Sequence, residues 1–532
     1  MSAKIDKILK SYKSLAQTPT LIAANIRPNG IISTTWSQRN LEKGQTMKFV
    51  RDIFITDLNK SAEGQPVDIS TELLSKTSDT EKFRAILREN NIKLPLNGHS
   101  VKSPIFSPDG KSLVWLQRKA GGPHHAAMQL VKTNLPLTEN SKPIIIIDVV
   151  YTDRKISNGK TFYGLFNTGF PKKPWASGNR LLLNTSQRYT INSYVVNIDS
   201  GEITELEFNN GSQLVMDVYE DKVLAVRQNY FRGDRLFLGK LPPPGSETSI
   251  TWTEVTNSET VQGLEGFMYK YLDLLADNVE GNNVDTFNAI YLGPKSGDKA
   301  SVPLIVWPHG GPHSAFANYF ILEAALYLLF GFAIVFVNYR GSTGCGQKSI
   351  DFLLGKVGSA DVSDCITATD KSLERFPWLN ANSIALIGAS HGGFLVTHLS
   401  GQYPDKFKAV IARNPVIDIA SMSFISDIPD WRYVEVGQEY NPGGEINNEA
   451  ISIMRRVSPI VHAHRVKAPT LLEIASNDLR VPPHQGTEYY LRLKANGVVT
   501  RMNLYNDNHS LGKVTNEIDK VINGLLWIQE HL

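Results

Sequence analysis

The stretch SIALIGASHGGFLVTHLSGQYP, residues 383–404, joins an apolar run to a helix-like segment through a sharp Gly-Ala-Ser-His-Gly sequence centred on Ser390. A nucleophilic serine needs this order of buried strand, tight turn and helix, because the turn exposes the hydroxyl and the helix start offers unpaired N–H groups. Glycines on both sides leave room for such a turn. A serine between two glycines is weak evidence by itself, so its interpretation depends on the surrounding sequence.

The C-terminal half of the chain alternates continuous apolar runs with helix-length segments. The runs lie at 303–307, 332–337, 383–387, 409–412, 470–475 and 501–505. Buried parallel strands have this pattern, and the segments between them indicate βαβ units. We therefore expect an α/β domain with a doubly wound, mostly parallel sheet, in which a ligand lies beyond the carboxyl ends of the strands.

Two titratable residues follow the ends of later strands. Asp478 comes just after the run 470–475, and His509 comes just after the run 501–505. α/β-Hydrolases order their catalytic triads as Ser, acid and His along the chain. The order and the strand-end positions predict that Ser390 is the nucleophile, that His509 is its base, and that Asp478 orients the imidazole.

Other residues near these positions are poorer candidates. His484 is expected at the start of a helix, and His531 in the terminal helix. Asp507 lies only two residues before His509, and we expect it to shape that loop instead of acting as the acid.

A tetrahedral intermediate also needs two N–H donors. One should come from the residue after the nucleophile, His391, and the other from a loop after an early strand. The sequence PHGGP, residues 308–312, follows the run 303–307, and its glycines allow close approach to a substrate. The backbone N–H groups of His391 and Gly311 are therefore the predicted oxyanion hole.

The N-terminal half has a different period. Short alternating strands with Pro-Asp-Gly or Asp-Ser-Gly turns recur between about residues 22 and 241, for example at 103–117 and 173–206. Spacings of roughly 40–50 residues between such units favour the blades of a β-propeller, with a sandwich as the alternative. The stretch 241–249 is either a linker or the exposed turn of the last blade. The predicted domains are an N-terminal helix docked on the hydrolase domain at 1–20, a propeller at 21–270 and a hydrolase domain at 271–532.

Composition excludes several classes of protein. The 532 residues carry a net charge of +3, which is too close to neutral for a nucleic-acid binder. The charges in the first 17 residues interrupt any signal-peptide core, and the apolar stretch 324–337 is too short to cross a membrane. Cys345 and Cys365 give neither a disulfide framework nor a metal-site spacing, which fits a reducing compartment. No metal and no cofactor are expected.

Several motifs resemble the acylaminoacyl peptidase branch of the prolyl oligopeptidase family of serine peptidases. The resemblance covers residues 285–532 and rests on the motifs HGGPHS, VNYRGSTGCGQ, GASHGGF, RNPVIDIASM, DIPDW and SNDLRVP. It implies an exopeptidase that removes an N-acylated amino acid from short peptides, with Ser390, Asp478 and His509 as its triad. It also implies that Arg480, Arg413 and Trp431 bind the substrate, the last two from loops specific to the branch, with a structural ion pair or a core aromatic as the alternative for each. It further implies that the protein is a cytoplasmic homo-oligomer.

The propeller departs from the family pattern, because about 220 residues allow only four or five blades. The resemblance passes from an early blade to a late one near residues 87–100. A shortened propeller leaves two alternatives to the acylaminoacyl peptidase open. One is a broader serine esterase or oligopeptidase, and the other is a non-catalytic propeller that binds partners.

Overall fold

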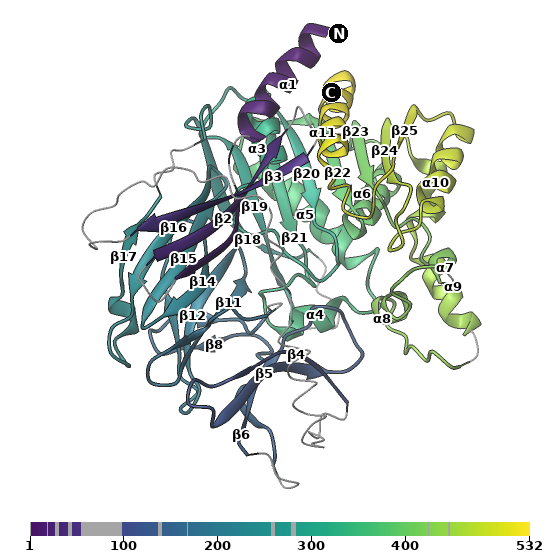
Figure 1. The fold of residues 1–532 in the computed structure, drawn as a ribbon. Helices are drawn as coiled ribbons and strands as arrows, with labels where there is room; N and C mark the ends of the chain where they lie inside the picture. The colour runs from purple at the N-terminus through teal and green to yellow at the C-terminus, as the bar shows by residue number, and fades with distance from the viewer. Residues whose placement is uncertain are drawn as a thin grey trace.

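The computed structural model describes residues 2–16, 18, 20–26, 31–40, 45–54, 98–136, 141–166, 169–256, 261–277, 284–423, 425–444 and 447–532. In Figure 1 the chain divides into a region of antiparallel sheets and a region in which helices flank one large sheet. The segment 87–97, at which the family resemblance was expected to skip blades, lies outside the described residues.

Within its described residues, the first region contains four sheets of three or four antiparallel strands. Each sheet is made of strands that follow one another directly, which is the connectivity of propeller blades. The strands are β1 (Thr20–Ile26), β2 (Ile31–Asn40) and β3 (Gln45–Phe54); β4 (His99–Phe106), β5 (Ser112–Lys119), β6 (Gln129–Asn134) and β7 (Ile144–Ile147); β10 (Trp175–Ala176), β11 (Arg180–Gln187), β12 (Thr190–Asn197) and β13 (Ile203–Leu206); and β14 (Ser212–Tyr219), β15 (Lys222–Asn229), β16 (Arg232–Lys240) and β17 (Thr251–Glu254). A two-stranded ribbon, β8 (Arg154–Lys155) and β9 (Thr161–Phe162), lies between the second and third sheets in the chain.

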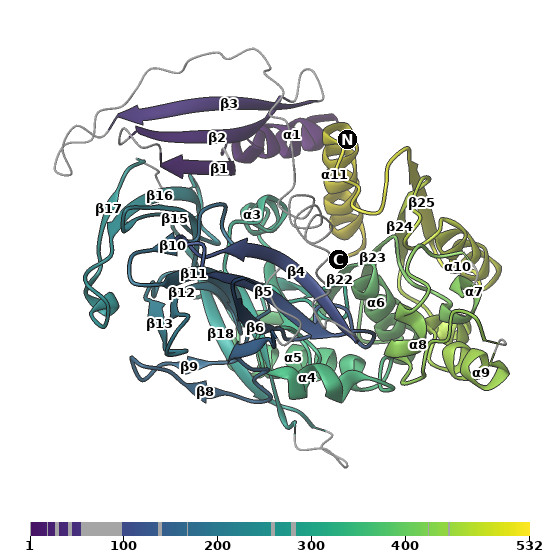
Figure 2. The same cartoon turned by 60° about the horizontal axis from the view of Figure 1, so that its bottom comes forward.

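Apolar side chains join these sheets face to face. One buried cluster links β5 and β6 to β11 and β12, a second links β11 and β12 to β14 and β15, and a third links β1 and β2 to β15 and β16. Figure 2 shows that the β1–β3 sheet lies beside the β14–β17 sheet; these are the first and last sheets of this region. A cavity of about 840 Å³ is bounded by residues of β1, β4, β11 and β14, so all four sheets surround one space, as blades surround a propeller axis.

The second region is built on one eight-stranded sheet. Its order is β18-β19-β21-β20-β22-β23-β24-β25, antiparallel as far as β21 and parallel from there onward. The strands are β18 (Phe267–Leu275), β19 (Thr286–Pro294), β20 (Val302–Pro308), β21 (Ala333–Asn338), β22 (Leu379–Ala389), β23 (Ala409–Arg413), β24 (Thr470–Ala475) and β25 (Thr500–Tyr505). The domain boundary predicted at 270/271 falls inside β18, so this sheet begins earlier than the sequence suggested.

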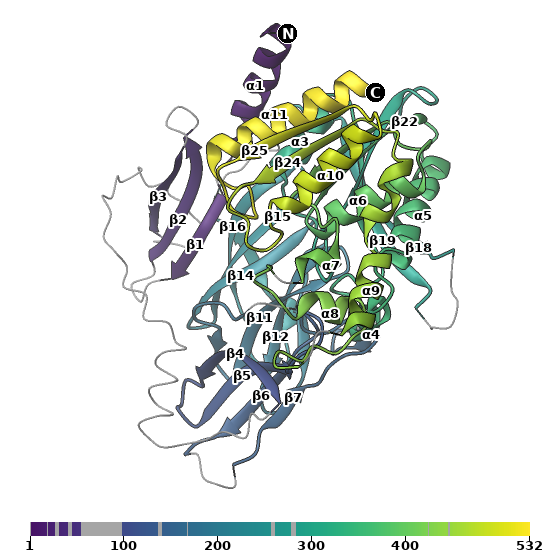
Figure 3. The same ribbon diagram turned by 90° about the vertical axis from the view of Figure 1, so that its right-hand side faces the viewer.

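Helices cover both faces of this sheet. Successive strand residues point to opposite faces, and the buried side chains accordingly form two large clusters. One face carries α5 (Ala360–Arg375), α6 (His391–Gln402) and α10 (His484–Ala495), and the other carries α3 (Leu322–Leu329) and α11 (Val514–His531). Figure 3 shows α11 and α10 on opposite sides of β24 and β25. The shorter helices are α4 (Gln347–Leu353), α7 (Ile419–Met422), α8 (Trp431–Glu435) and α9 (Asn448–Arg456), with 3₁₀ turns η1 (Glu247–Ser249) and η2 (Pro459–Arg465).

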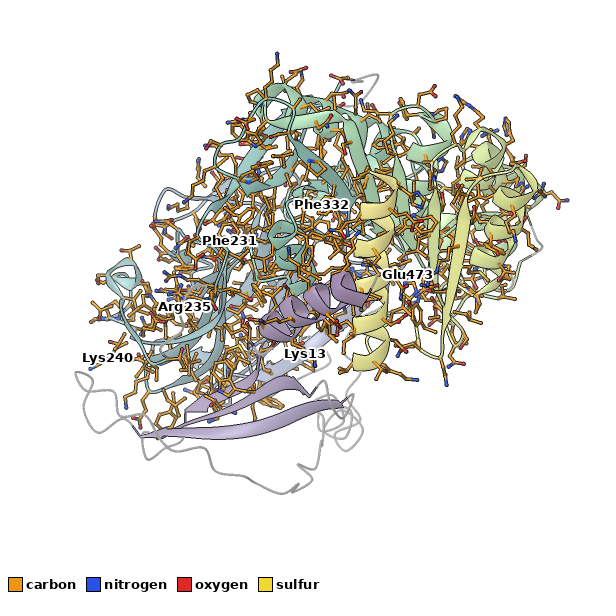
Figure 4. The ribbon with its side chains drawn as sticks, turned by 90° about the horizontal axis from the view of Figure 1, so that it is seen from above. Lys13, Phe231, Arg235, Lys240, Phe332 and Glu473 are labelled. Carbon is orange, nitrogen blue, oxygen red and sulfur yellow. The ribbon has the colours of Figure 1, made fainter. Side chains whose placement is uncertain are left out.

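The N-terminal helix α1 (Ser2–Ala16) packs on α3 and α11, as Figure 4 shows. Its buried face contains Ile8, Tyr12 and Leu15, whereas Lys10 and Lys13 are exposed. This separation of apolar and basic side chains is what holds an amphipathic helix on a core.

The predicted fold class is confirmed: propeller-like antiparallel sheets precede an α/β-hydrolase sheet. All six predicted apolar runs of the C-terminal half lie in strands of the large sheet. The stretch 241–249 is a connection between β16 and β17 within one sheet, so the linker interpretation is wrong. Among the described residues, no helix is long and apolar enough to span a bilayer.

Candidate active site

Ser390 lies in a sharp turn between β22 and α6. Its backbone has φ 59° and ψ −120°, a conformation that costs free energy for any residue with a Cβ. Hydrogen bonds hold the turn in place, because the Ser390 N–H donates to the carbonyl of Arg413 over 2.9 Å, and the Ser390 carbonyl accepts from Phe394. The surrounding structure therefore forces the serine out of the regular strand and helix on either side.

The positions around Ser390 need glycine, because neighbouring atoms lie too close to leave room for a side chain. A Cβ on Gly388 would lie 2.1 Å from the carbonyl oxygen of Gly392, and one on Gly392 would lie 2.6 Å from the carbonyl oxygen of Pro308. A Cβ on Gly310 would lie 3.3 Å from the Cβ of Ser390. The PHGGP loop is thus packed directly against the serine turn, and glycine is what lets the two backbones approach.

Asp478 and His509 come from the loops after β24 and β25, and they meet. The Nδ1 atom of His509 lies 2.5 Å from Oδ2 of Asp478. The other oxygen of Asp478, Oδ1, accepts hydrogen bonds from the backbone N–H groups of Arg480 at 2.8 Å and Val481 at 3.0 Å. The Asp478 side chain is 0% exposed and that of His509 is 30% exposed, so a fixed, buried carboxylate holds a partly accessible imidazole.

The loop that carries His509 is ordered by its neighbours. The His509 carbonyl accepts from Nδ2 of Asn414 at 2.9 Å. The Asp507 carboxylate accepts from the backbone N–H groups of Asn508 at 2.8 Å and Lys513 at 3.0 Å. Asp507 therefore shapes this loop, as expected from the sequence, while Asp478 is the acid that contacts the imidazole.

Ser390 and His509 line one cavity of about 280 Å³, together with residues from both regions of the chain. The sheet region contributes His124 and His125, from the loop between β5 and β6. The remaining lining residues are Gly311, His313, Val416, Met422, Ile428, Trp431, Glu435, Arg480 and Val481. The cavity therefore combines an apolar wall with several polar and titratable side chains around the serine, as a small-molecule site does.

Trp431 and His391 fix the walls around Ser390. The indole N–H of Trp431 donates to the carbonyl oxygen of Gly311 over 3.1 Å, so this tryptophan holds the PHGGP loop. The His391 ring is buried, and its Nε2 lies 2.9 Å from Oδ2 of Asp361. Both side chains are thus engaged in positioning, and His391 can contribute to the reaction only through its backbone N–H group.

The two predicted arginines have different surroundings. Arg480 lines the cavity, where its guanidinium bonds to the Asp427 carboxylate at 2.6 Å. Arg413 does not line this cavity. Its guanidinium is buried between Glu323, at 2.6 Å, and Glu473, also at 2.6 Å, on the face of the sheet that carries α3. Arg413 thus forms a structural ion-pair network. One of its partners, Glu473, is labelled beside α11 in Figure 4.

Sequence reasoning missed a buried ion pair in the cavity wall. His313 and Glu435 are each about 1% exposed, and Nε2 of His313 lies 3.2 Å from Oε2 of Glu435. Burial lowers the pKa of His313, but the Glu435 carboxylate and the Gly341 carbonyl outweigh burial and hold that pKa above its usual value. His313 lies inside the HGGPHS motif, whereas Glu435 has no local signal.

In the part of the chain that the structure describes, no group of three or more His, Cys, Asp or Glu side chains is arranged to hold a metal ion.

Comparison with known families gives two matches that together cover most of the chain. Residues 318–532 match the Prolyl oligopeptidase family, and residues 68–265 match the Acylamino-acid-releasing enzyme, N-terminal domain. The acylamino-acid-releasing enzyme match includes the antiparallel sheets from β4 to β17, and the prolyl oligopeptidase match includes β21 to β25 of the large sheet with its helices from α3 onward. Each region is thus recognised independently of the other.

Individual relatives agree with these matches. The chain is 38% identical to the acylamino-acid-releasing enzyme of Rattus norvegicus over 81% of its own length, and 35% identical to that of Arabidopsis thaliana over 80%. It spans 59% and 58% of these relatives, so it is shorter than they are. An acylaminoacyl peptidase structure from Pyrococcus horikoshii shares the fold, with a TM-score of 0.65, 16% identity, and coverage of 98% of this chain and 97% of that one. Residues 318–532 therefore match the prolyl oligopeptidase family of serine peptidases, and the chain is similar to acylamino-acid-releasing enzymes along most of its length.

Proposed function

We propose that this protein is a serine exopeptidase that removes an N-acylated amino acid from the N-terminus of short peptides. The observation that carries the proposal is that His509, which contacts the buried Asp478, lines the same cavity as Ser390. The relatives named acylamino-acid-releasing enzymes supply the substrate class.

In the first half of the reaction, the Ser390 hydroxyl attacks the carbonyl carbon of the acylated residue. Because Nδ1 of His509 faces Asp478, its Nε2 is the atom left to accept the Ser390 proton. His509 then gives this proton to the departing amine. The rest of the peptide leaves with a free N-terminus, and the N-acyl amino acid stays on Ser390 as an ester.

In the second half, His509 takes a proton from water, and the resulting hydroxide attacks the ester. The N-acyl amino acid leaves, and Ser390 recovers its proton from His509. The negative oxygen formed in each half would be stabilised by the backbone N–H groups of His391 and Gly311. The support for this assignment is the packing of the PHGGP loop against the Ser390 turn, which Trp431 maintains.

Ser390→Ala tests the proposal. We expect the wild type to react with a fluorophosphonate probe and to hydrolyse acetyl-alanyl p-nitroanilide, and the variant to lose both properties by three orders of magnitude or more. Ser400→Ala, which changes a buried serine on α6 away from the turn, is the matched control. Near wild-type turnover in Ser390→Ala would contradict the assignment.

The two alternatives are separated by the same assay. A broader esterase or oligopeptidase would hydrolyse free alanyl p-nitroanilide as fast as the acetylated compound. A non-catalytic binding protein would not react with the probe at all. We further propose a homo-oligomer in a reducing, cytoplasmic compartment; the support for the compartment is that Cys345 and Cys365 are both free thiols.

A further inference from the structure

A second cavity, of about 190 Å³, adjoins the one that contains Ser390. The two share His125 and His313 as lining residues. The Nδ1 atom of His125 lies 3.0 Å from the carbonyl oxygen of His313, so these residues connect the sheet region to the hydrolase region at this point. The second cavity is otherwise lined by Lys102, Arg118, Ala126, Met128, Phe166, Ser186, Ser314 and Thr343. We call it the basic cavity.

Two cations from adjacent strands face the basic cavity. Lys102 is on β4 opposite Leu116 of β5, and Arg118 follows Leu116 by two residues. Directly opposed residues, and residues two apart on a strand, lie on the same face of a sheet. The side chains of Lys102 and Arg118 are both half-buried. The fold thus presents both cations on one face, where their charges are less screened than on an open surface.

These cations are not neutralised locally. None of the lining residues of the basic cavity is acidic. Among the described residues no carboxylate lies within 4.0 Å of Lys102 or Arg118, and Arg118 donates from Nη1 to the Pro123 carbonyl. The acidic group that acts on Arg118 is Asp430, which is itself bonded to Nε2 of His124 at 2.9 Å.

The same positive charges act on His125, which lines both cavities. Burial lowers the pKa of His125, and Lys102, His124 and Arg118 lower it further, although the hydrogen bond with the His313 carbonyl opposes them. A cavity with uncompensated positive charge and little room favours a small anionic group.

We propose that the basic cavity binds the C-terminal carboxylate of a short peptide whose acylated end lies at Ser390. This inference rests on the proposed function, because the exopeptidase reaction places the leaving peptide beyond the scissile bond. An extended chain covers about 3.3–3.6 Å per residue. Because the two cavities share His125 and His313, a short peptide can reach from one into the other. A carboxylate between Lys102 and Arg118 would form charge-assisted hydrogen bonds, and a long peptide could not place its carboxylate there.

Binding to the Ser390→Ala protein tests this inference without requiring turnover. Isothermal calorimetry would compare acetylated alanine peptides of two to five residues, each as the free acid and as the C-terminal amide. We expect the acid to bind about tenfold more tightly than the amide at one or two lengths. We expect this difference to disappear in Lys102→Met and Arg118→Gln.

Lys119→Met is the matched control, since Lys119 is exposed on the same strand as Arg118 and does not line the basic cavity. It should keep the preference for the acid. Equal binding of acid and amide at every length would overturn the inference, and so would an equal loss in Lys119→Met, which would indicate a diffuse field instead of a site. If Ser390→Ala prefers the acid but the wild-type protein does not hydrolyse acetyl-alanyl p-nitroanilide, the carboxylate site would be supported and the proposed function contradicted.

Discussion

Asp478→Asn is the substitution for which the structure predicts the most specific failure. Oδ1 of Asp478 accepts two backbone N–H groups, from Arg480 and Val481, and Oδ2 faces Nδ1 of His509. An asparagine at 478 has one oxygen and one NH₂ group. The oxygen must take the position of Oδ1, because an NH₂ group there would face two donors. The NH₂ group is therefore directed at His509.

This orientation puts the proton on the wrong nitrogen. With an NH₂ donor opposite it, Nδ1 of His509 must accept, so Nε2 carries the proton in the neutral imidazole. Nε2 then cannot take the proton from Ser390. In the Ser-His-Asp template the same change lowers kcat about 10⁴-fold, which corresponds to about 5.5 kcal/mol of transition-state stabilisation. The reversed orientation would lose two backbone hydrogen bonds, at roughly 0.5–1.5 kcal/mol each, which makes it the less favourable choice.

The assay is steady-state hydrolysis of acetyl-alanyl p-nitroanilide, with thermal unfolding to show that the fold persists. We expect kcat to fall about 10⁴-fold while the unfolding midpoint changes little, because asparagine has the same shape as aspartate. Asp405→Asn is the control, since the carboxylate of this exposed residue pairs with Lys467 at the surface, and its backbone carbonyl, which accepts from Nζ of Lys408, is unchanged by the substitution. A kcat within tenfold of wild type for Asp478→Asn, in a folded protein, would refute the assignment of His509 as a base oriented by Asp478.

Three further predictions concern packing and titration. Arg413→Met should lower the free energy of unfolding by about 3–5 kcal/mol, because Glu323 and the buried Glu473 lose their cation; an unchanged denaturation midpoint would contradict the structural role of this arginine. Gly392→Ala should reduce kcat by displacing Pro308, whose carbonyl oxygen would lie 2.6 Å from the new Cβ, whereas Gly443→Ala, with nothing within 4 Å, should not; equal activity in both variants would show that the Ser390 turn tolerates a side chain. Burial lowers the pKa of His309 and of His398 to about 3, so the folded protein keeps both neutral while the unfolded chain protonates them near pH 6.5. Their stabilising contribution is complete above that pH and is lost as pH falls toward 3, at about 1.4 kcal/mol per pH unit for each histidine. Denaturation at pH 6.5 and 5.0 should therefore show a smaller loss of stability in His398→Asn than in wild type, and an identical loss would contradict this origin of acid sensitivity.

The features that were predictable from sequence are those with a local signal. Ser390, Asp478 and His509 each follow an apolar run that becomes a strand, and parallel strands bring their carboxyl ends to one edge of a sheet. The serine turn is encoded by glycines whose replacement would cause a backbone clash. The PHGGP loop was predictable in the same way, from its place at the end of the apolar run that forms β20.

The features that were missed depend on contacts between distant parts of the chain. His125 meets the His313 carbonyl across 188 positions, and His124 meets Asp430 across 306. Neither histidine lies in a periodic pattern, so nothing local indicates that the loop after β5 enters the active-site cavity. Arg413 illustrates the opposite case, because its motif suggested a substrate role while its buried carboxylate partners come from α3 and β24.

The antiparallel sheets contribute directly to the cavities near Ser390. The central cavity between the four sheets shares Phe166 and Ser186 with the basic cavity, which in turn shares His125 and His313 with the cavity around Ser390. The three cavities therefore adjoin one another in a row. β4 and β5 line the basic cavity, and the loop after β5 lines both the basic cavity and the cavity around Ser390. The proposed carboxylate site therefore depends on β4, β5 and the loop after β5, which carry Lys102, Arg118 and His125 respectively. The buried clusters that join adjacent sheets hold these elements in place.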